Sequence, residues 1–170
     1  MDETANNIYF YSNIRGPYKC FSNFYATTFL DGDIEYKCSE QYFMKKKQEL
    51  FDPLNIELGN LILGSINPAE IKKYGRQVKN YNEQQWNEVR YNKMVDGLKL
   101  KFNQNEDLKR ILLSTQNKNI YEASPYDNIW GTGYNIQDTY NIIENKRTDI
   151  KLGRNLLGRA LMDVREWLRT

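Results

Sequence analysis

The chain has 170 residues, of which 40% are hydrophobic and 14% aromatic, and this is enough to build one core, so we expect a single domain over residues 1–170. Its 24 basic and 22 acidic residues leave a formal net charge of +2, which excludes a chain-wide field that would hold it on nucleic acid or on a membrane surface. The chain has no histidine, which excludes Ser-His and Cys-His nucleophilic pairs and imidazole bases, so catalysis would have to use carboxylates, lysine, tyrosine or the backbone.

The beginning of the chain predicts a small sheet. Residues 8–11 are β-branched and aromatic and are typical of a short strand. Residues 20–25 (C-F-S-N-F-Y) fit either a strand at the edge of the core or a packed loop with its polar groups inward. An Asp-Gly pair at 31–32 separates two β-forming runs, residues 27–30 and 34–36, and therefore predicts a hairpin.

Helical periodicity and end signals predict most of the other elements. We expect helices over residues 39–51, 54–64, 67–75, 84–102, 105–113 and 152–168, and a returning strand over residues 120–123. The last helix should turn Leu157, Leu161, Val164 and Leu168 inward and Arg159, Arg165 and Glu166 outward. The expected fold class is mainly α, an α-rich α+β fold with a small N-terminal β-hairpin or sheet.

Two segments do not have the pattern of a helix or strand. Residues 124–133 (S-P-Y-D-N-I-W-G-T-G) combine Pro125 with two glycines, and this predicts an ordered loop. Residues 134–151 are polar and lack a clear period, so we expect a long loop or lid there, and the most mobile part of the chain.

Cysteine use and the N-terminus indicate an intracellular protein. Cys20 and Cys38 form no C-x-x-C pair, and we expect them to be reduced packing thiols. The N-terminal residues M-D-E-T-A-N-N lack the basic start and apolar run of a secretory signal, and no apolar stretch reaches the ~18 residues of a membrane span. These observations predict a cytoplasmic location with no membrane partner.

Residues 39–47 (S-E-Q-Y-F-M-K-K-K) contain the most promising catalytic pair. Glu40 and Lys47 are seven residues apart, about two helical turns at ~3.6 residues per turn, so both side chains should share one face of a helix. Ser39 is the expected N-cap, which would leave Glu40 in the first turn, where the helix dipole favours a carboxylate. The alternative is a solvated helix face, which is the usual meaning of a run such as Lys45 to Lys47.

Aromatic residues mark two candidate binding features, each with a structural alternative. Trp86 and Arg90 are four residues apart and could line a pocket or simply pack at the surface, with the arginine reaching solvent. Trp130 lies beside Gly131 and three residues after Asp127, an arrangement that suits an aromatic base or a sugar. The alternative is a tryptophan that anchors the loop to the core.

Taken together, six motifs resemble those of the NADAR family (NAD- and ADP-ribose-associated, YbiA-like) of N-glycosidases. They are F-S-N-F at 21–24, E-Q-Y-F-M-K-K-K at 40–47, W-N-E-V-R at 86–90, K-F at 101–102, E-A-S-P-Y-D-N-I-W-G at 122–131 and G-R-N-L-L-G-R-A-L-M at 153–162. They follow the order of the family and cover nearly the whole chain. The resemblance implies a mainly helical fold with a minor β part and cleavage of a bond between ribose C1 and a nitrogen.

The resemblance also implies site residues. Glu40 corresponds to the family's glutamate and Lys47 to the lysine seven residues later, while Gln41 stands where the family usually has histidine. Glu40 would be the general acid and base, and Lys47 would either hold phosphate as a point charge or form a Schiff base with an opened ribose. The expected substrate-binding residues are Ser22, Asn23, Phe24, Trp86, Arg90, Asp127, Trp130, Gly131, Arg154 and Asn155. Of these, Arg154 and Asn155 would meet phosphate at the start of the last helix.

Three functions remain open on these grounds. The first is hydrolysis of ribosylamino-pyrimidine phosphate intermediates of riboflavin biosynthesis, and the second is removal of ADP-ribose from guanine, which would make ADP-ribosylated nucleic acid a partner. The third is a non-catalytic module that binds ADP-ribose or a nucleotide. Direct nucleic-acid binding through Lys45 to Lys47 lacks a charge excess, and no metal or organic cofactor is implied.

Overall fold

The computed structural model describes residues 2–12 and 15–170. The chain forms two compact units, which we treat separately. The central unit is one continuous segment, Asn23–Asn105, and the terminal unit combines Met1–Ser22 with Glu106–Thr170. The prediction of one domain stays a prediction, since two such units can belong to the same domain.

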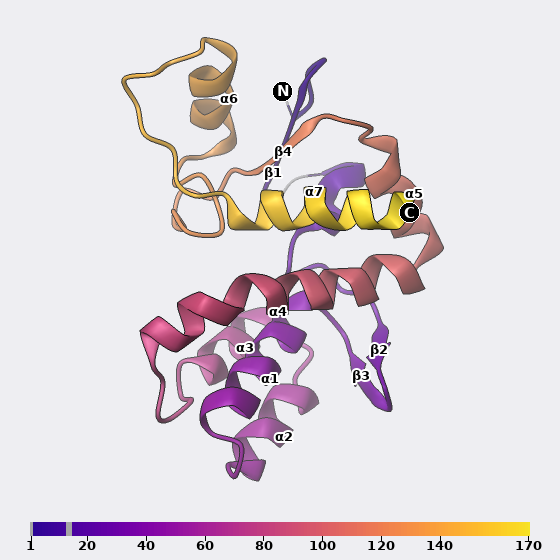
Figure 1. Cartoon of the computed structure of the whole chain (residues 1–170), viewed down its shortest axis with the longest axis vertical. Helices are drawn as coiled ribbons and strands as arrows, with labels where there is room; N and C mark the ends of the chain where they lie inside the picture. The colour runs from indigo at the N-terminus through magenta and orange to yellow at the C-terminus, as the bar shows by residue number, and fades with distance from the viewer. Residues whose placement is uncertain (1, 13–14) are drawn as a thin grey trace. The chain divides into compact units, whose positions relative to one another are not determined.

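The central unit consists of a hairpin and four helices (Figure 1). Its elements are β2 (Phe29–Asp31), β3 (Ile34–Tyr36), α1 (Ser39–Phe51), α2 (Ile56–Gly64), α3 (Pro68–Gly75) and α4 (Glu83–Gln104). The predicted hairpin is confirmed, with Asp31 opposite Ile34 and Gly32 at a φ of 60°, the left-handed conformation that glycine adopts most easily. The helices expected over residues 39–51, 54–64, 67–75 and 84–102 are also confirmed, apart from small shifts at their ends.

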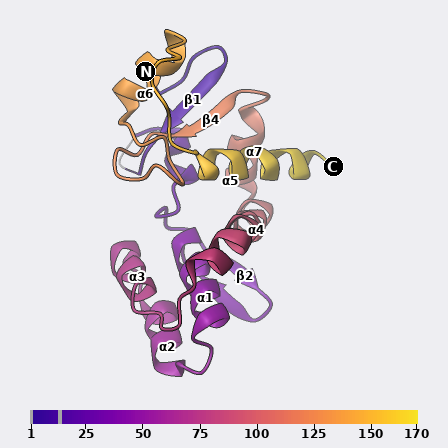
Figure 2. The same ribbon diagram turned by 60° about the vertical axis from the view of Figure 1, so that its left-hand side comes forward.

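Helix α1 is at the centre of this unit, where it contacts α2, α3 and α4 (Figure 2). A small aromatic cluster of Phe29, Tyr36 and Tyr42 joins it to the hairpin. Close packing against α4 depends on Gly97, because a Cβ atom at this position would lie 2.5 Å from the Tyr42 ring. The element that carries both catalytic candidates is therefore held on several sides.

Asparagine side chains begin the other helices of the central unit. The side-chain oxygens of Asn55, Asn67 and Asn82 accept hydrogen bonds from first-turn N–H groups of α2, α3 and α4. The N-cap predicted at Ser39 is wrong: Cys38 is the N-cap of α1 and makes no side-chain cap, while Ser39 is the first helical residue. The glutamate is still in the first turn, as expected.

The terminal unit contains a parallel strand pair surrounded by helices. Its elements are β1 (Asn7–Phe10), the 3₁₀ helix η1 (Pro17–Phe21), α5 (Glu106–Ser114), β4 (Asn119–Glu122), α6 (Ile136–Glu144) and α7 (Leu156–Arg169). Strands β1 and β4 pair in register from Asn7 with Asn119 to Phe10 with Glu122. Helix α7 packs against β4 through Gly158, where a Cβ atom would lie 2.1 Å from the Ile120 carbonyl oxygen.

The structure corrects three expectations in this part of the chain. The strand alternative for residues 20–25 is wrong, because they begin within η1 and continue as turns, so the packed-loop alternative is the better one. Residues 134–151 are not one long loop, since they contain α6, whose N-cap Asn135 accepts a hydrogen bond from the Asp138 N–H at 2.7 Å. Arg165 is not outward: it is 6% exposed and donates to Thr115 Oγ1 and to the Lys118 carbonyl, each at 2.8 Å.

Candidate active site

Glu40 is fixed at the first turn of α1 by the turn that precedes the hairpin. Its backbone N–H donates to the Asn23 carbonyl at 3.0 Å, and its side chain is only 8% exposed. The first turn is also the positive end of the helix dipole, where an ionised carboxylate is favoured. Glu40 is therefore a buried acid whose direction is set by the backbone of α1.

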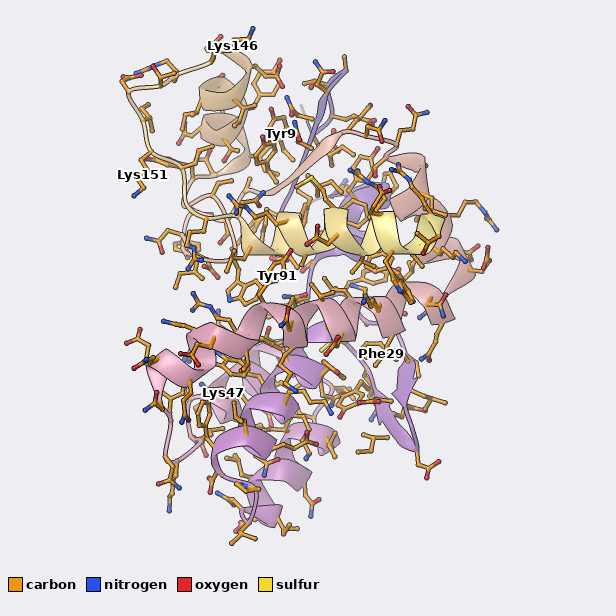
Figure 3. All side chains as sticks on the ribbon, viewed as in Figure 1. Tyr9, Phe29, Lys47, Tyr91, Lys146 and Lys151 are labelled. Atoms are coloured by element: carbon orange, nitrogen blue, oxygen red, sulfur yellow. The ribbon has the colours of Figure 1, made fainter. Side chains whose placement is uncertain are left out.

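Lys47, two turns further along α1, has an unusual environment for a lysine (Figure 3). Its Nζ donates to the Gly75 carbonyl at 2.9 Å and lies 4.7 Å from the centroid of the Tyr81 ring. Burial lowers the pKa of this amine, the Glu40 carboxylate opposes that effect, and the Arg76 cation adds to it, with a net lowering. Because Glu40 acts electrostatically on Lys47, the two candidates belong to one local environment. An amine with a lowered pKa is the form of lysine that can act as a nucleophile.

Trp86 and Arg90 are part of the interior of the central unit. The Trp86 ring packs on Phe43, with centroids 4.9 Å apart, and on Phe51 at 6.1 Å. Trp86 is 6% exposed and Arg90 is 8% exposed, so the surface-packing alternative for this pair is wrong. Their roles in substrate binding stay predictions.

The α1 N-terminus also holds two polar atoms whose hydrogen-bonding capacity is unused. Asn23 Oδ1 and Ser39 Oγ are both buried, and neither has a hydrogen-bond partner among the described residues. Buried polar atoms without partners are uncommon in native proteins and call for an explanation. Ser39 precedes Glu40 in the sequence, and the Asn23 carbonyl accepts the hydrogen bond from the Glu40 N–H. A substrate hydroxyl is a chemically suitable partner for both polar atoms. Phe24, the other predicted residue here, is 36% exposed.

The remaining predicted binding residues belong to the terminal unit, whose two chain segments come before and after the central segment in the sequence. They are Ser22, Asp127, Trp130, Gly131, Arg154 and Asn155. Ser22 is 4% exposed, and its N–H donates to the Lys19 carbonyl at 3.2 Å. Residues 124–133 contain no helix or strand, which confirms the ordered loop.

Asp127 organises this loop. Its Oδ1 accepts hydrogen bonds from the N–H groups of Ile129 at 2.9 Å and Trp130 at 2.8 Å, which is an Asx turn. Position 131 is occupied by glycine because a Cβ atom there would lie only 2.8 Å from the Glu122 carbonyl oxygen and 2.9 Å from that of Asp127. The backbone of the loop carrying Trp130 is therefore ordered by its own hydrogen bonds, and the Trp130 side chain is of intermediate exposure.

The loop also caps helix α7. Loop carbonyls from Asn128 to Thr132 accept hydrogen bonds from every backbone N–H of residues 153–157, at 2.7 to 3.1 Å. These are the donors that an anion at a helix N-terminus would use. These backbone donors are therefore used within the protein, and the phosphate contact expected of Arg154 and Asn155 stays a prediction.

Asn155 makes a second connection at the same place. Its Nδ2 donates to the Ile120 carbonyl at 2.8 Å and its Oδ1 accepts from the Glu122 N–H at 2.9 Å, while its backbone is left-handed with a φ of 51°. The side chain thus ties α7 to β4. The substrate contact expected of Asn155 stays a prediction beside this structural role.

Arg154 borders a surface pocket of about 420 Å³ in the terminal unit. The pocket is lined by Asn128, Ile129, Thr132, Gly133, Tyr134, Lys151, Leu152, Gly153 and Arg154. Two lining residues are cations and none of those described is a carboxylate, so the pocket suits an anionic group. Figure 3 shows Lys151 on the segment that leads from α6 to α7.

The structure gives Gln41 a definite role. Its Nε2 donates to the carbonyls of Ile62 at 2.9 Å, Leu63 at 3.2 Å and Ser65 at 3.0 Å, and its Oε1 accepts from the Lys37 N–H at 2.7 Å. Gln41 is completely buried. It therefore satisfies the carbonyl groups at the end of α2 and holds them against the start of α1.

Sequence reasoning missed the groups that surround the Lys47 amine. Gly75 was expected only to end a helix, and Tyr81 was not singled out. Neither could be found from sequence, because they are 28 and 34 residues from Lys47 and meet it only through the packing of α3 on α1. A tyrosine just before a helix N-cap carries no catalytic signal of its own.

Two further classes of site find no support in the described residues. No group of three or more cysteine, aspartate or glutamate side chains there is placed to hold a metal ion. No described helix has the length and apolar character required to span a bilayer. Cys20 and Cys38 are buried thiols that are not joined in a disulfide, as expected.

Known proteins resemble this chain over almost its full length. The family model described as the NADAR domain matches residues 9–169. "N-glycosidase R617" of Acanthamoeba polyphaga mimivirus is 41% identical over 152 residues, covering 86% of this chain and 85% of that protein. "N-glycosidase Npun_R5314" of Nostoc punctiforme is 30% identical over 162 residues, covering 95% of this chain and 92% of that protein.

Two other comparisons concern a longer protein and the fold. "Riboflavin biosynthesis protein VVA0006" of Vibrio vulnificus is 28% identical over 95% of this chain but only 38% of its own length. The solved NMR structure of the E. coli protein YbiA superimposes with a TM-score of 0.72 at 24% identity, over 99% of this chain and 89% of that one, and shows the same fold. With a family model that spans nearly every residue and relatives named for the same activity, this chain belongs to the NADAR family and is an N-glycosidase.

Proposed function

We propose that the protein hydrolyses the bond between ribose C1 and nitrogen in ribosylamino-pyrimidine phosphates, the early intermediates of riboflavin biosynthesis. The observation that carries the proposal is the Lys47 amine, which burial shifts toward its neutral form on the same helix as the buried Glu40. The name of the Vibrio vulnificus relative supports the substrate class.

In the first half of the reaction the neutral Lys47 amine attacks ribose C1. The C1 to nitrogen bond breaks, its electron pair stays on the departing nitrogen, and Glu40, acting as an acid, protonates that nitrogen. One proton of the attacking amine passes to O4′ as the ring opens, which leaves an iminium between Nζ and C1. Glu40 is then a carboxylate.

In the second half Glu40 acts as a base. It takes a proton from a water molecule while the water oxygen adds to C1, which gives a neutral carbinolamine. The bond between C1 and Nζ then breaks with its electron pair going to Nζ, the hydroxyl proton moves to Nζ, and C1 becomes an aldehyde carbonyl. Ribose phosphate leaves and the amine is restored. Glu40 is thus an acid in the first half of the reaction and a base in the second, and it is protonated again at the end.

Within the terminal unit, Arg154 and Lys151 are proposed to bind an anionic group such as a phosphate. Both border the pocket whose described lining contains no carboxylate. A guanidinium matches phosphate geometry with two parallel hydrogen bonds, whereas an ammonium acts as a point charge.

The first prediction concerns Glu40 and Lys47. Glu40→Gln and Lys47→Ala should each lower kcat/KM by at least about a hundredfold, because each removes a group that participates in bond cleavage. The measurement is the release of free pyrimidine from a ribosylamino-pyrimidine phosphate, which chromatography quantifies. Lys45→Ala is the matched control, since Lys45 is on the same helix but pairs with Glu49 at 3.1 Å.

The substrate panel also separates the rival functions. ADP-ribosylated guanine is included, and cleavage of that compound alone would replace the proposed substrate. Tight binding of ADP-ribose without any product would indicate a binding module. Full activity of both variants on a cleaved substrate would contradict the assignment of Glu40 and Lys47.

A further inference from the structure

The Lys47 amine contacts two groups that neither the sequence nor the family comparison assigns to the reaction. The first is the carbonyl of Gly75, the last residue of α3, which accepts its hydrogen bond at 2.9 Å. The second is the ring of Tyr81, whose centroid lies 4.7 Å from Nζ. Tyr81 is in the segment between α3 and α4, and its side chain is 44% exposed.

Both contacts favour the protonated amine. The carbonyl at the C-terminus of α3 is at the negative end of that helix, which attracts a cation. The electron-rich face of a tyrosine ring attracts an ammonium group, and the contact strengthens as water is removed. Burial and the Arg76 cation have the opposite effect, and the Glu40 carboxylate again favours the cation.

The Tyr81 ring also has an aromatic neighbour on helix α1. This ring meets Phe51 edge to face, with centroids 5.4 Å apart, and Phe51 in turn packs on Trp86. Phe51 is the last residue of α1, the helix that carries Lys47. The Tyr81 ring therefore contacts both the last residue of α1 and the Lys47 amine. The exposed part of the ring is open to an incoming ligand.

We propose that Tyr81 is a positioning residue of the active site. Together with the Gly75 carbonyl, its ring holds the Lys47 amine as a cation in the free protein, and substrate binding ends this contact between the amine and the ring. The inference rests on the proposed use of Lys47 as the nucleophile. It adds a step to that function, because the amine must leave the ring and give up a proton, which leaves Lys47 neutral and Glu40 as the acid, before it can attack C1.

The experiment measures the amine directly and needs no substrate. The full-length protein is treated with a trace amount of an amine-acylating reagent over a range of pH, and modification of Lys47 is quantified by mass spectrometry. Lys45 and Lys46 on the same peptide serve as internal references. Tyr81→Leu should lower the midpoint pH of Lys47 modification by about 0.4 to 1.5 pH units, since the ring no longer stabilises the cation.

Two variants separate the ring from other effects. Tyr81→Phe keeps the ring and should keep the wild-type midpoint, whereas a role of the Tyr81 hydroxyl would not be rescued in this way. Tyr74→Leu is the matched control: Tyr74 is on the neighbouring α3, its hydroxyl donates to Glu70 at 2.6 Å, and its loss should leave the midpoint unchanged.

The opposite result is equally clear. If Tyr81 only excluded water, Tyr81→Leu would admit solvent to the amine and raise the midpoint, so an upward shift or no shift overturns the inference. Borohydride reduction of the enzyme with its substrate tests the other half. No trapped adduct at Lys47, together with a lowered midpoint in Tyr81→Leu, would reject the nucleophile but retain the positioning role.

Discussion

At the scale of single residues, buried polar side chains of this chain combine structural and chemical roles. Gln41 shows how the two can be told apart, because its amide is fully used: three carbonyls accept from Nε2 and one N–H donates to Oε1. A side-chain amide neither gains nor loses a proton at neutral pH. Position 41 therefore supports Glu40 through the backbone and takes no part in proton transfer.

Replacing Gln41 should reveal this support. Gln41→Leu should lower the free energy of unfolding by about 3 kcal/mol, since it leaves buried backbone groups without partners. Gln41→His should cost less, because an imidazole can still donate one hydrogen bond and accept another. Urea denaturation followed by circular dichroism measures both.

The matched control for these variants is Gln48→Leu on the same helix. Gln48 donates to the Asp52 carbonyl at 2.9 Å, but its Oε1 has no partner, so its loss should cost less than that of Gln41. Equal losses for Gln41→Leu and Gln48→Leu would contradict the role given to Gln41. A changed pH optimum in Gln41→His at unchanged stability would instead show that position 41 exchanges protons.

At the scale of elements, one carboxylate connects the end of α6 to the beginning of the chain. Glu144, its last residue, accepts at Oε1 from Thr4 Oγ1 and Asn7 Nδ2 at 3.0 Å and from the Tyr9 hydroxyl at 2.7 Å. The hydrogen bond from Tyr9, followed by that from Asn7, lowers the pKa of Glu144, whereas desolvation raises the pKa of Tyr9. The end of α6 is thus joined to β1 and to the residues before it.

Because these hydrogen bonds are made to a carboxylate, the attachment of α6 to β1 should depend on pH. A carboxyl whose pKa is lower in the folded protein stabilises it fully above the unfolded-state pKa of about 4.3, and loses that contribution as the pH falls through the folded-state value. We therefore expect amide hydrogen exchange in α6 to accelerate, relative to α7, when the pH falls below about 5 after correction for the intrinsic rate.

Glu144→Gln supplies the comparison for α6. An amide can still accept these hydrogen bonds but has no charge to lose, so the acid-induced acceleration should be absent. Glu166→Gln on α7 is the control, because that carboxylate bonds only Arg169 among the described contacts, at 3.0 Å. An acid-induced acceleration that persists in Glu144→Gln would show that another group controls α6.

At the scale of the whole molecule, the two units differ in how they are built from the chain. The central unit is continuous and has its own aromatic cluster, whereas the terminal unit needs two distant segments to form the pair β1 and β4. Contacts between distant segments close long loops and form at a higher entropic cost. The two units should therefore differ in their ability to fold alone.

Separate expression of the units tests this difference. A fragment of residues 23–105 should show helical circular dichroism and a cooperative thermal transition, because all of its elements and their caps are present. A fragment of residues 106–170 should not, because β4 has lost β1. Cooperative folding of the second fragment, or a disordered first fragment, would contradict this division of the chain.

The sequence by itself determined the local structure and the family. Asp-Gly at 31–32 specified a hairpin, and asparagine caps and apolar spacing specified most helices, because these signals act over a few residues. The exception, α6, was obscured by a polar sequence in which only Thr139 and Ile142 are buried. Glu40 and Lys47 could be named in advance because their spacing along one helix needs nothing from the rest of the fold.

Only the tertiary structure decided the chemical environment of these residues. Gly75 and Tyr81 reach Lys47 through the packing of the segments after α2, Gln41 finds its carbonyl partners at the end of α2, and Arg165 turns inward because Thr115 and the Lys118 carbonyl lie beneath it. Burial and hydrogen bonding depend on groups brought together from distant parts of the chain. A pattern of residues can therefore indicate a candidate pair such as Glu40 and Lys47, but only packing sets the charge that each member carries.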